Sequence, residues 1–249
     1  MKWVRWRRSW VENMSTSSNF NFTTNELTTK GIVCLENQSF NDQELLELAH
    51  TLSSRKDKAL LEWDFGPIME MKFSASAKNY LFSEEEVPFH WDGAFLKEPK
   101  YLIFFCTESS GGAGGEGMFC DTRGVYHALS GDEKKQLQKL KLEYKTEKLA
   151  HYGGSIEVPV LQNHPDTGEK ILRFALPVQS KKNPVTRTIL SGNENLCLRI
   201  EELLRDENHI YQHTWKKGDL LIVDNFSYIH GRHSLGENLR RSFKRVQVL

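Results

Sequence analysis

The sequence is poor in cysteine: it has four in 249 residues, and no two of them form a C-x-x-C pair. Without such pairs, neither a disulfide framework nor a cysteine-based zinc site is expected. Cys106 lies within an apolar segment, as reduced thiols of a protein core commonly do. We therefore expect free thiols and a cytoplasmic location.

The sequence also lacks long apolar runs and an excess of charge of one sign. No segment reaches the roughly 20 consecutive apolar residues that a membrane helix needs. Lysine plus arginine equals aspartate plus glutamate, at 33 each, so no long-range field draws the protein toward nucleic acid. The expected partner is a small molecule, with no nucleic acid and no membrane, while the oligomeric state stays open.

The first 30 residues differ in composition from the rest. Residues 1–12 contain three tryptophans and three arginines but lack the apolar centre of a secretory signal. Residues 15–29 are rich in serine, threonine and asparagine, as flexible tethers are. We expect a flexible N-terminal extension over 1–30 and a single domain over 31–249, a length that one β barrel can fill.

Short strands outnumber helices in the expected secondary structure. Strands are expected at 32–34, 66–73, 101–106, 141–146, 158–161, 170–174, 209–215, 219–223, 228–230 and 242–248. Helices are expected at 41–52, with Asn41 as the N-cap, and at 122–129, 132–140 and 193–205. A turn at 163–168 predicts a hairpin. The pattern indicates a mainly β fold with flanking helices, of the barrel or jelly-roll kind.

One group of residue types points to metal chemistry. His90 and Asp92 are two residues apart at the end of an expected strand, so their side chains point the same way. A second, distant histidine can complete a three-ligand face on an octahedral ion. His230 directly follows an apolar segment, whereas His233 lies in a polar loop segment, so we favour His230. These donors suit iron(II), although zinc accepts the same set.

Arginines near the C-terminus favour iron. If 242–248 is extended, Arg241, Phe243, Arg245 and Gln247 share one face of the strand. A guanidinium can clamp a carboxylate with two parallel hydrogen bonds, as a 2-oxo acid cosubstrate requires. One arginine could then hold the cosubstrate and the other a substrate carboxylate. The alternative for Arg245 is a surface ion pair.

A glycine-rich segment supports a competing hypothesis. Gly112, Gly114 and Gly117 fit the pattern G-x-G-x-x-G of a dinucleotide-binding loop. The preceding chain lacks the alternating strands and helices of that fold, and 118–120 is typical of a strand rather than of the start of a helix. A glycine-rich hairpin or lip at the edge of a pocket is the favoured interpretation.

Several motifs together resemble the taurine dioxygenase and clavaminate synthase-like superfamily over residues 31–249. They are His90-Trp91-Asp92-Gly93, Gly114-Gly115-Glu116, Phe119-Cys120-Asp121-Thr122, Gly218-Asp219, Asp224-Asn225, and His230 followed by Arg240-Arg241. Residues 61–67 and the first of these motifs are similar to dioxygenases of isonitrile biosynthesis in the pyoverdine and paerucumarin cluster group.

The resemblance implies a double-stranded β-helix, a cupin-like jelly roll, with iron(II) held by His90, Asp92 and His230. It implies that 2-oxoglutarate chelates the iron through its 1-carboxylate and 2-oxo groups and that Arg241 binds its 5-carboxylate. Arg245 matches a position that often meets substrate. The chain is thus expected to be an Fe(II)/2-oxoglutarate-dependent dioxygenase, an oxidoreductase that consumes dioxygen and releases succinate and carbon dioxide.

The resemblance also bears on the ligands. Relatives usually carry a threonine that helps bind the cosubstrate where this chain has Gly117, so either Arg241 suffices with water or another hydroxyl, or cosubstrate affinity is reduced. Trp91 and Phe95 are candidates for binding a carboxylate-bearing substrate such as a tyrosine-derived isonitrile of secondary metabolism, although aromatic residues in strands are also ordinary core. Hydroxylation and desaturation with decarboxylation are both open outcomes.

Two hypotheses from other classes remain beside the dioxygenase. One is a nicotinamide dinucleotide oxidoreductase that uses the glycine-rich segment 112–117. The other is a non-catalytic barrel that binds a small ligand or a zinc ion.

Overall fold

The structure is a computed structural model that describes residues 26–53, 58–73, 77, 79–110, 113–147, 153–236 and 240–249. Most of the expected N-terminal extension, residues 1–25, lies outside the described residues. Residues 26–30 form a short helix in which Leu27 is buried, and Leu27 O accepts a hydrogen bond from Gly31 N at 2.8 Å. The packed part of the chain therefore begins before Gly31.

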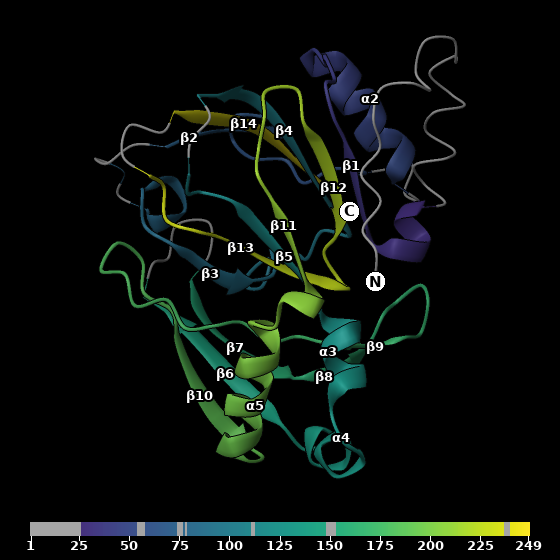
Figure 1. Cartoon of the computed structure of the whole chain (residues 1–249), viewed down its shortest axis with the longest axis vertical. Coiled ribbons are helices and arrows are strands. Elements are labelled where there is room, and N and C mark those ends of the chain that lie inside the picture. The colour runs from purple at the N-terminus through teal and green to yellow at the C-terminus, as the bar shows by residue number, and fades with distance from the viewer. Residues whose placement is uncertain are drawn as a thin grey trace.

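Two antiparallel sheets form the upper part of the molecule in Figure 1. The first has the order β1 (Ile32–Leu35), β12 (Leu220–Asp224), β4 (Tyr101–Ser109), β14 (Arg241–Val248) and β2 (Ile68–Lys72). The second has the order β11 (Ile210–His213), β5 (Gly117–Asp121), β13 (Tyr228–Arg232) and β3 (Val87–His90). Phe104 and Leu221 of the first sheet share a buried cluster with Phe119 and Tyr228 of the second. The two sheets therefore pack face to face.

Strand β4 is central because both of its faces are covered. It is apolar and buried at every position from Tyr101 to Cys106. One face contributes to the cluster between the sheets, and the other packs against helix α2 (Asp42–Leu52). Helix α2 begins with a capping box at Asn41 and buries Leu45 and Leu48 at helical spacing. It thereby closes the outer face of the first sheet.

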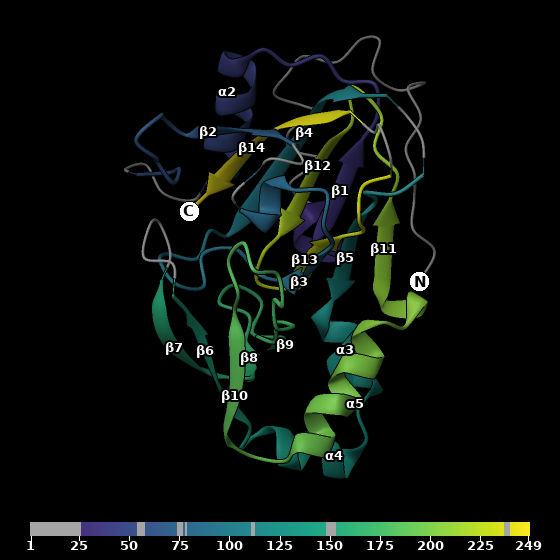
Figure 2. The same ribbon diagram turned by 90° about the vertical axis from the view of Figure 1, so that its left-hand side faces the viewer.

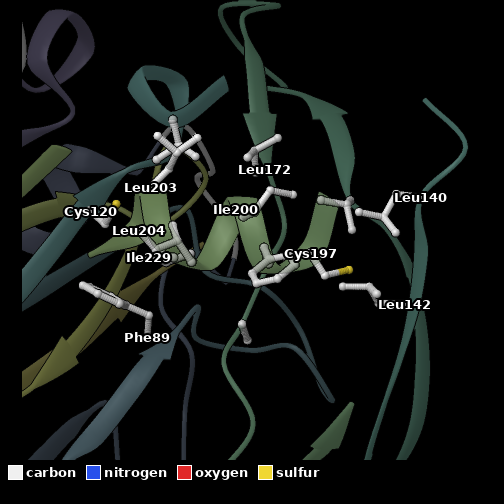
Figure 3. Close-up of a cluster of buried hydrophobic side chains, with 14 of the residues drawn as sticks. Phe89, Cys120, Leu140, Leu142, Leu172, Cys197, Ile200, Leu203, Leu204 and Ile229 are labelled. Carbon is white, nitrogen blue, oxygen red and sulfur yellow. The ribbon is translucent and has the colours of Figure 1, made fainter. Parts of the chain in front are cut away.

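A second layer of structure lies below the two sheets (Figures 1 and 2). It contains the antiparallel sheet β10 (Thr186–Ser191), β6 (Lys141–Thr146) and β7 (Gly154–Pro159), the hairpin β8 (Leu161–Asn163) and β9 (Lys170–Leu172), and the helices α3 (Thr122–Ala128), α4 (Gly131–Leu137) and α5 (Glu194–Leu204). Figure 3 shows Cys197, Ile200 and Leu204 of α5 among side chains that include Phe89 and Ile229 of the second sheet. This cluster joins the two parts of the molecule. Short 3₁₀ helices, Tyr80–Phe82 and Glu207–His209, precede β3 and β11.

The expected mainly β architecture with few helices is confirmed, with differences in detail. Helix α4 ends at Leu137 rather than at 140. The strand expected at 158–161 is divided between β7 and β8 after Pro159, which has no N–H to donate to a ladder. Strand β10 was not predicted. Many of its residues are polar, as is usual in an exposed edge strand, so the sequence shows no clear apolar pattern there.

The cysteines agree with the prediction from the composition. All four cysteines are free, as their spacing predicts. Burial raises the pKa of the Cys106 thiol to about 12, so that the thiol stays protonated at neutral pH. Among the described residues, no helix combines the length and the apolar character needed to cross a bilayer.

Candidate metal centre

The three expected metal ligands come from two paired strands and the turn that follows one of them. His90 ends β3 and His230 lies within β13, and the two are direct partners in the antiparallel register. Their ring centroids are 4.3 Å apart. Asp92 follows in the turn after β3. Because β3 is an edge strand, it tolerates Pro88 without losing a central ladder bond.

The ligand atoms of this group converge. One ring nitrogen of each histidine and one Asp92 oxygen lie within 4.8 Å of one another. His90 Nε2 is 3.6 Å and His230 Nε2 is 3.8 Å from Asp92 Oδ1. His233, the alternative ligand, does not belong to this group, and its backbone N–H donates to Glu116 O at 3.1 Å. Of the two downstream histidines, the structure brings His230 to the cluster.

Electrostatics favour the protonation forms that bind metals. Burial alone would raise the pKa of Asp92, but the Arg245 guanidinium, 3.0 Å from Oδ2, and the two imidazoles hold it well below its usual value. Burial, together with the neighbouring His90, lowers the pKa of His230 to about 3. His90 Nδ1 donates to Pro88 O at 2.9 Å, which directs Nε2 to the cluster. A carboxylate and two imidazole nitrogens therefore face one another.

This donor set fits iron(II). Two nitrogens and one carboxylate oxygen on one face leave further coordination positions for other ligands. Beside the cluster, the buried atoms Arg245 Nε and Gln247 Oε1 have no hydrogen-bond partner among the described residues. Because buried polar atoms are normally paired, the site has the character of one that is completed by polar ligands.

A buried asparagine fixes the turn that carries Asp92. Asn225 is fully buried, and its Oδ1 accepts a hydrogen bond from Asp92 N at 3.0 Å. Its Nδ2 donates to Asp92 O at 3.1 Å and to Pro99 O at 2.9 Å. Sequence reasoning gave Asn225 no role of its own, and its place in the motif Asp224-Asn225 was its only signal.

A second buried network holds the neighbouring Trp91. The Trp91 indole N–H donates to Glu98 Oε1 at 2.8 Å, and Glu98 Oε2 accepts from Arg173 at 2.7 Å. Arg173, itself 1% exposed, also donates to Asn225 O at 2.6 Å. The network therefore connects Trp91 to the clamp on Asp92. Nothing in the sequence could indicate it, because Glu98 and Arg173 meet only in the folded chain.

Two cavities meet at the ligand cluster, and His90 and Arg245 line both of them. The first cavity, about 870 Å³ with its mouth included, is walled mainly by apolar and aromatic side chains. Trp91 and Phe95, the candidate substrate-binding residues, both line it. The second cavity, about 540 Å³ on the same measure, lies on the side of Trp215. The cluster can thus face two different ligands.

The two candidate arginine clamps differ in their surroundings. Arg245 is buried, not a surface residue, and it donates with Gln247 to Asp92 Oδ2, at 3.0 and 2.7 Å. Arg241 is also buried and donates to the carbonyl oxygens of Gly115 and, at 3.4 Å, Gly114. Arg241 Nε has no partner among the described residues, and Arg241 does not line either cavity wall. The structure therefore brings Arg245, but not Arg241, to the ligand cluster itself.

The glycine-rich segment does not form a dinucleotide loop. Gly112 lies outside the described residues. Gly114 and Gly115 have positive φ values of 95° and 68°, and Gly117 begins strand β5. A dinucleotide fingerprint would instead open a helix after a parallel strand. The carbonyl groups of this segment serve as acceptors for Arg241.

Comparison with known proteins decides among the three hypotheses. Residues 11–247 match the family described as "Taurine catabolism dioxygenase TauD, TfdA family". The chain belongs to this family. As a TauD/TfdA dioxygenase with a His-Asp-His cluster, it is an oxidoreductase that depends on iron(II), 2-oxoglutarate and dioxygen.

Relatives of this TauD/TfdA dioxygenase include enzymes named for isonitriles. It is 38% identical, over 76% of its length and 73% of the relative's, to a 3-((Z)-2-isocyanoethenyl)-1H-indole synthase of Fischerella ambigua. It is 26% identical, over 75% of its length and 67% of the relative's, to a tyrosine isonitrile desaturase of Pseudomonas aeruginosa.

Solved structures agree on the fold. PvcB, an Fe, alpha-ketoglutarate dependent oxygenase from an isonitrile synthetic pathway, matches 92% of this chain and 79% of its own, with a TM-score of 0.72 and 22% identity. AAD-2 in complex with Mn(II) and N-oxalylglycine matches 94% of this chain and 88% of its own, with a TM-score of 0.69 and 16% identity.

Proposed function

We propose that this dioxygenase oxidises an isonitrile derived from an aromatic amino acid and releases a vinyl isonitrile, with loss of the carboxylate. The similarity to the isocyanoethenyl indole synthase carries the proposal. The similarity to a tyrosine isonitrile desaturase and the aromatic first cavity beside the ligand cluster support it. The class of partner is thus a small molecule that combines an aromatic ring, an isonitrile and a carboxylate.

The atoms of the named product define the reaction. The compound 3-(2-isocyanoethenyl)indole has the ring and two side-chain carbons of tryptophan, with the amine nitrogen in an isonitrile and the carboxyl carbon absent. Formation from tryptophan isonitrile removes one hydrogen from Cβ and releases the carboxylate as carbon dioxide. This oxidation removes two electrons from the substrate, and they pass to dioxygen. Dioxygen receives two more electrons from 2-oxoglutarate, which becomes succinate and carbon dioxide.

The residues of the cluster are assigned roles on this basis. His90, Asp92 and His230 are the proposed ligands of iron, which together with 2-oxoglutarate and dioxygen supplies the oxidising chemistry when bound. Arg241 is the proposed partner of the cosubstrate 5-carboxylate, through its unpartnered Nε. Arg245 lines both cavities and is the proposed partner of the substrate carboxylate.

The walls of the first cavity suit an aromatic ring with one polar atom. Trp91 packs edge-on against Tyr144, with ring centroids 5.6 Å apart, and Phe95 lies on the same wall. A polar pair, Thr146 and Asn183, also lines the cavity, and Thr146 Oγ1 donates to Asn183 Oδ1 at 3.4 Å. An indole N–H or a phenol O–H could pair with these groups.

We also propose that the fold is a double-stranded β-helix in a single domain. The two antiparallel sheets that face each other support the assignment of a double-stranded β-helix. The cluster shared by α5 and the second sheet supports a single domain over 31–249.

An assay of turnover tests the proposed substrate class. The protein is loaded with iron(II) without oxygen and then given 2-oxoglutarate, dioxygen and the isonitrile of tryptophan or of tyrosine. We expect succinate to form in step with a product that lacks carbon dioxide and two hydrogens, and we expect His90→Ala to form neither. A product with one added oxygen would contradict desaturation. Succinate that does not depend on either isonitrile would contradict the substrate class.

A further inference from the structure

The lining of the second cavity includes a buried arginine, Arg232, that forms no ion pair with a described residue. Arg232 and Arg241 are buried, and neither forms an ion pair within the described part of the chain. Arg232, which lines the cavity, donates to Ser83 O at 2.7 Å and to Glu85 O at 2.8 Å. Arg241 donates to Gly115 O, two residues before Gly117 of the cavity lining. Both guanidinium groups therefore pair with carbonyl oxygens rather than with carboxylates. None of the described residues that line the cavity is an aspartate or a glutamate. An anion in this cavity would therefore be stabilised.

Trp215 brings a hydrogen-bond donor to the same cavity. Its side chain is 5% exposed and lines the cavity, and its indole N–H forms no hydrogen bond with any described residue. An indole N–H can only donate, so only an acceptor can satisfy it. An oxygen of a ligand bound in the cavity would be such an acceptor.

The position of this donor is fixed by its surroundings. The Trp215 ring packs edge-on against His213 and Phe243, with centroid distances of 4.6 Å to each. Trp215 O accepts a hydrogen bond from Ser109 Oγ at 3.1 Å, and Lys216 N donates to Asp219 Oδ2 at 2.8 Å. The indole is therefore held in place before a ligand arrives.

Gly117 leaves room for the indole to approach. A Cβ atom at position 117 would lie 3.0 Å from Trp215 Nε1 and 3.0 Å from Phe119 Cε2, closer than most real Cβ contacts. Gly117 does not have a positive φ, so the backbone itself does not require glycine here. The space requirement explains why this position carries no side chain and hence no hydroxyl.

We propose that the Trp215 indole N–H donates to the distal carboxylate of 2-oxoglutarate and takes over the part that a side-chain hydroxyl at position 117 would play. In this arrangement the neighbouring arginines supply the charge, and Trp215 supplies a directed hydrogen bond. The inference concerns the cosubstrate of the family and does not depend on the isonitrile proposed as substrate.

Trp215→Phe tests the inference because it keeps an aromatic ring and removes the N–H. The iron(II)-loaded protein is titrated without oxygen with 2-oxoglutarate, and binding is followed by the visible absorption band of the chelate and by calorimetry. Hydrogen bonds to charged groups predict a Kd raised roughly 10- to 100-fold. The Kd of 2-oxobutyrate, which lacks the distal carboxylate, should be unchanged. Trp63→Phe, in the first cavity, is the matched control and should leave both values unchanged.

Two results would overturn the inference. One is an equal 2-oxoglutarate affinity in Trp215→Phe and the native protein. The other is a loss of affinity for both 2-oxo acids by the same factor, which would mean that Trp215 only shapes the site. If Trp215→Phe does not fold, Gly117→Ala is used instead to displace the indole. This substitution must raise the Kd of 2-oxoglutarate by a larger factor than the Kd of 2-oxobutyrate. Turnover is not measured, so the result is separate from that of the isonitrile assay.

Discussion

At the scale of single residues, the proposed metal centre depends on side chains that are not themselves proposed ligands. Asn225 holds both backbone groups of Asp92, and Arg245 and Gln247 hold its carboxylate. Such partners orient the ligands and adjust their basicity. The three proposed ligands could be selected from the sequence because an H-x-D pair with a distant histidine is a recognisable pattern. The role of Arg173 could not be predicted, because the sequence alone does not distinguish a buried arginine from a surface one.

Asn225→Ala should weaken metal binding while the three ligands remain present. The change leaves the Asp92 N–H and two carbonyl groups without partners, and loss of such support typically lowers metal affinity by about 10- to 100-fold. The buried unsatisfied groups should also lower the free energy of unfolding by about 1 to 3 kcal/mol. Competition with a metal-binding dye and urea unfolding measure the two effects. Asn163→Ala, an exposed asparagine, is the control, and equal metal affinity in both variants would contradict the assigned role.

The lowered pKa of Asp224 predicts how the stability of the folded protein responds to acid. Burial would raise its pKa, but hydrogen bonds from His164 at 2.8 Å, from Ser227 and from Phe226 N at 2.9 Å hold the pKa below its usual value. A lowered carboxyl pKa stabilises the folded state above the unfolded pKa of about 3.9, and this contribution is lost as pH falls through the folded pKa.

Asp224→Asn should therefore be less stable than the native protein at pH 7, by roughly 1 to 3 kcal/mol. It should also lose less stability between pH 5 and pH 3, because the titrating carboxyl group is absent. Urea unfolding at both pH values measures the difference. The same loss in the two proteins would mean that Asp224 does not contribute to the acid response.

At the scale of elements, the alternation along β14 is what organises the site. Phe243, Arg245 and Gln247 face the cavities, while Val246 and Val248 pack in the cluster below α2, as the period of two predicts. The register against β4 shifts between Ser242 and Phe243, which no sequence pattern indicates. Such irregularities depend on the partner strand, so the sequence of one strand alone cannot predict them.

Asn41→Ala tests the helix boundary that the sequence predicted best. The Asn41 side chain accepts a hydrogen bond from Glu44 N at 2.9 Å, and the Glu44 carboxylate accepts one from Asn41 N at 2.8 Å. Loss of an N-cap costs about 1 kcal/mol, so the Tm should fall by a few degrees. Gln43→Ala, at an exposed position of the same helix, should change Tm little. An equal effect of the two substitutions would show that the cap does not set the stability of α2.

At the scale of the whole molecule, the site exists because strands far apart in sequence are neighbours in one sheet. The pairing of β3 with β13 places His90 opposite His230, and the second sheet presents both at the junction of the two cavities. The sequence predicted the three residues that the structure brings together and the mainly β class. The strand order, the two cavities and the exposed strand β10 depend on long-range packing, which local patterns do not encode.

Anaerobic titration with iron(II) and then 2-oxoglutarate tests the central assignment most directly. We expect one iron per chain and a visible charge-transfer band that appears only when 2-oxoglutarate is added. His90→Ala and His230→Ala should lose both signals while retaining the native Tm to within a few degrees. A protein that keeps zinc and shows no band with 2-oxoglutarate, or a His230→Ala variant that binds iron as the native chain does, would contradict the account.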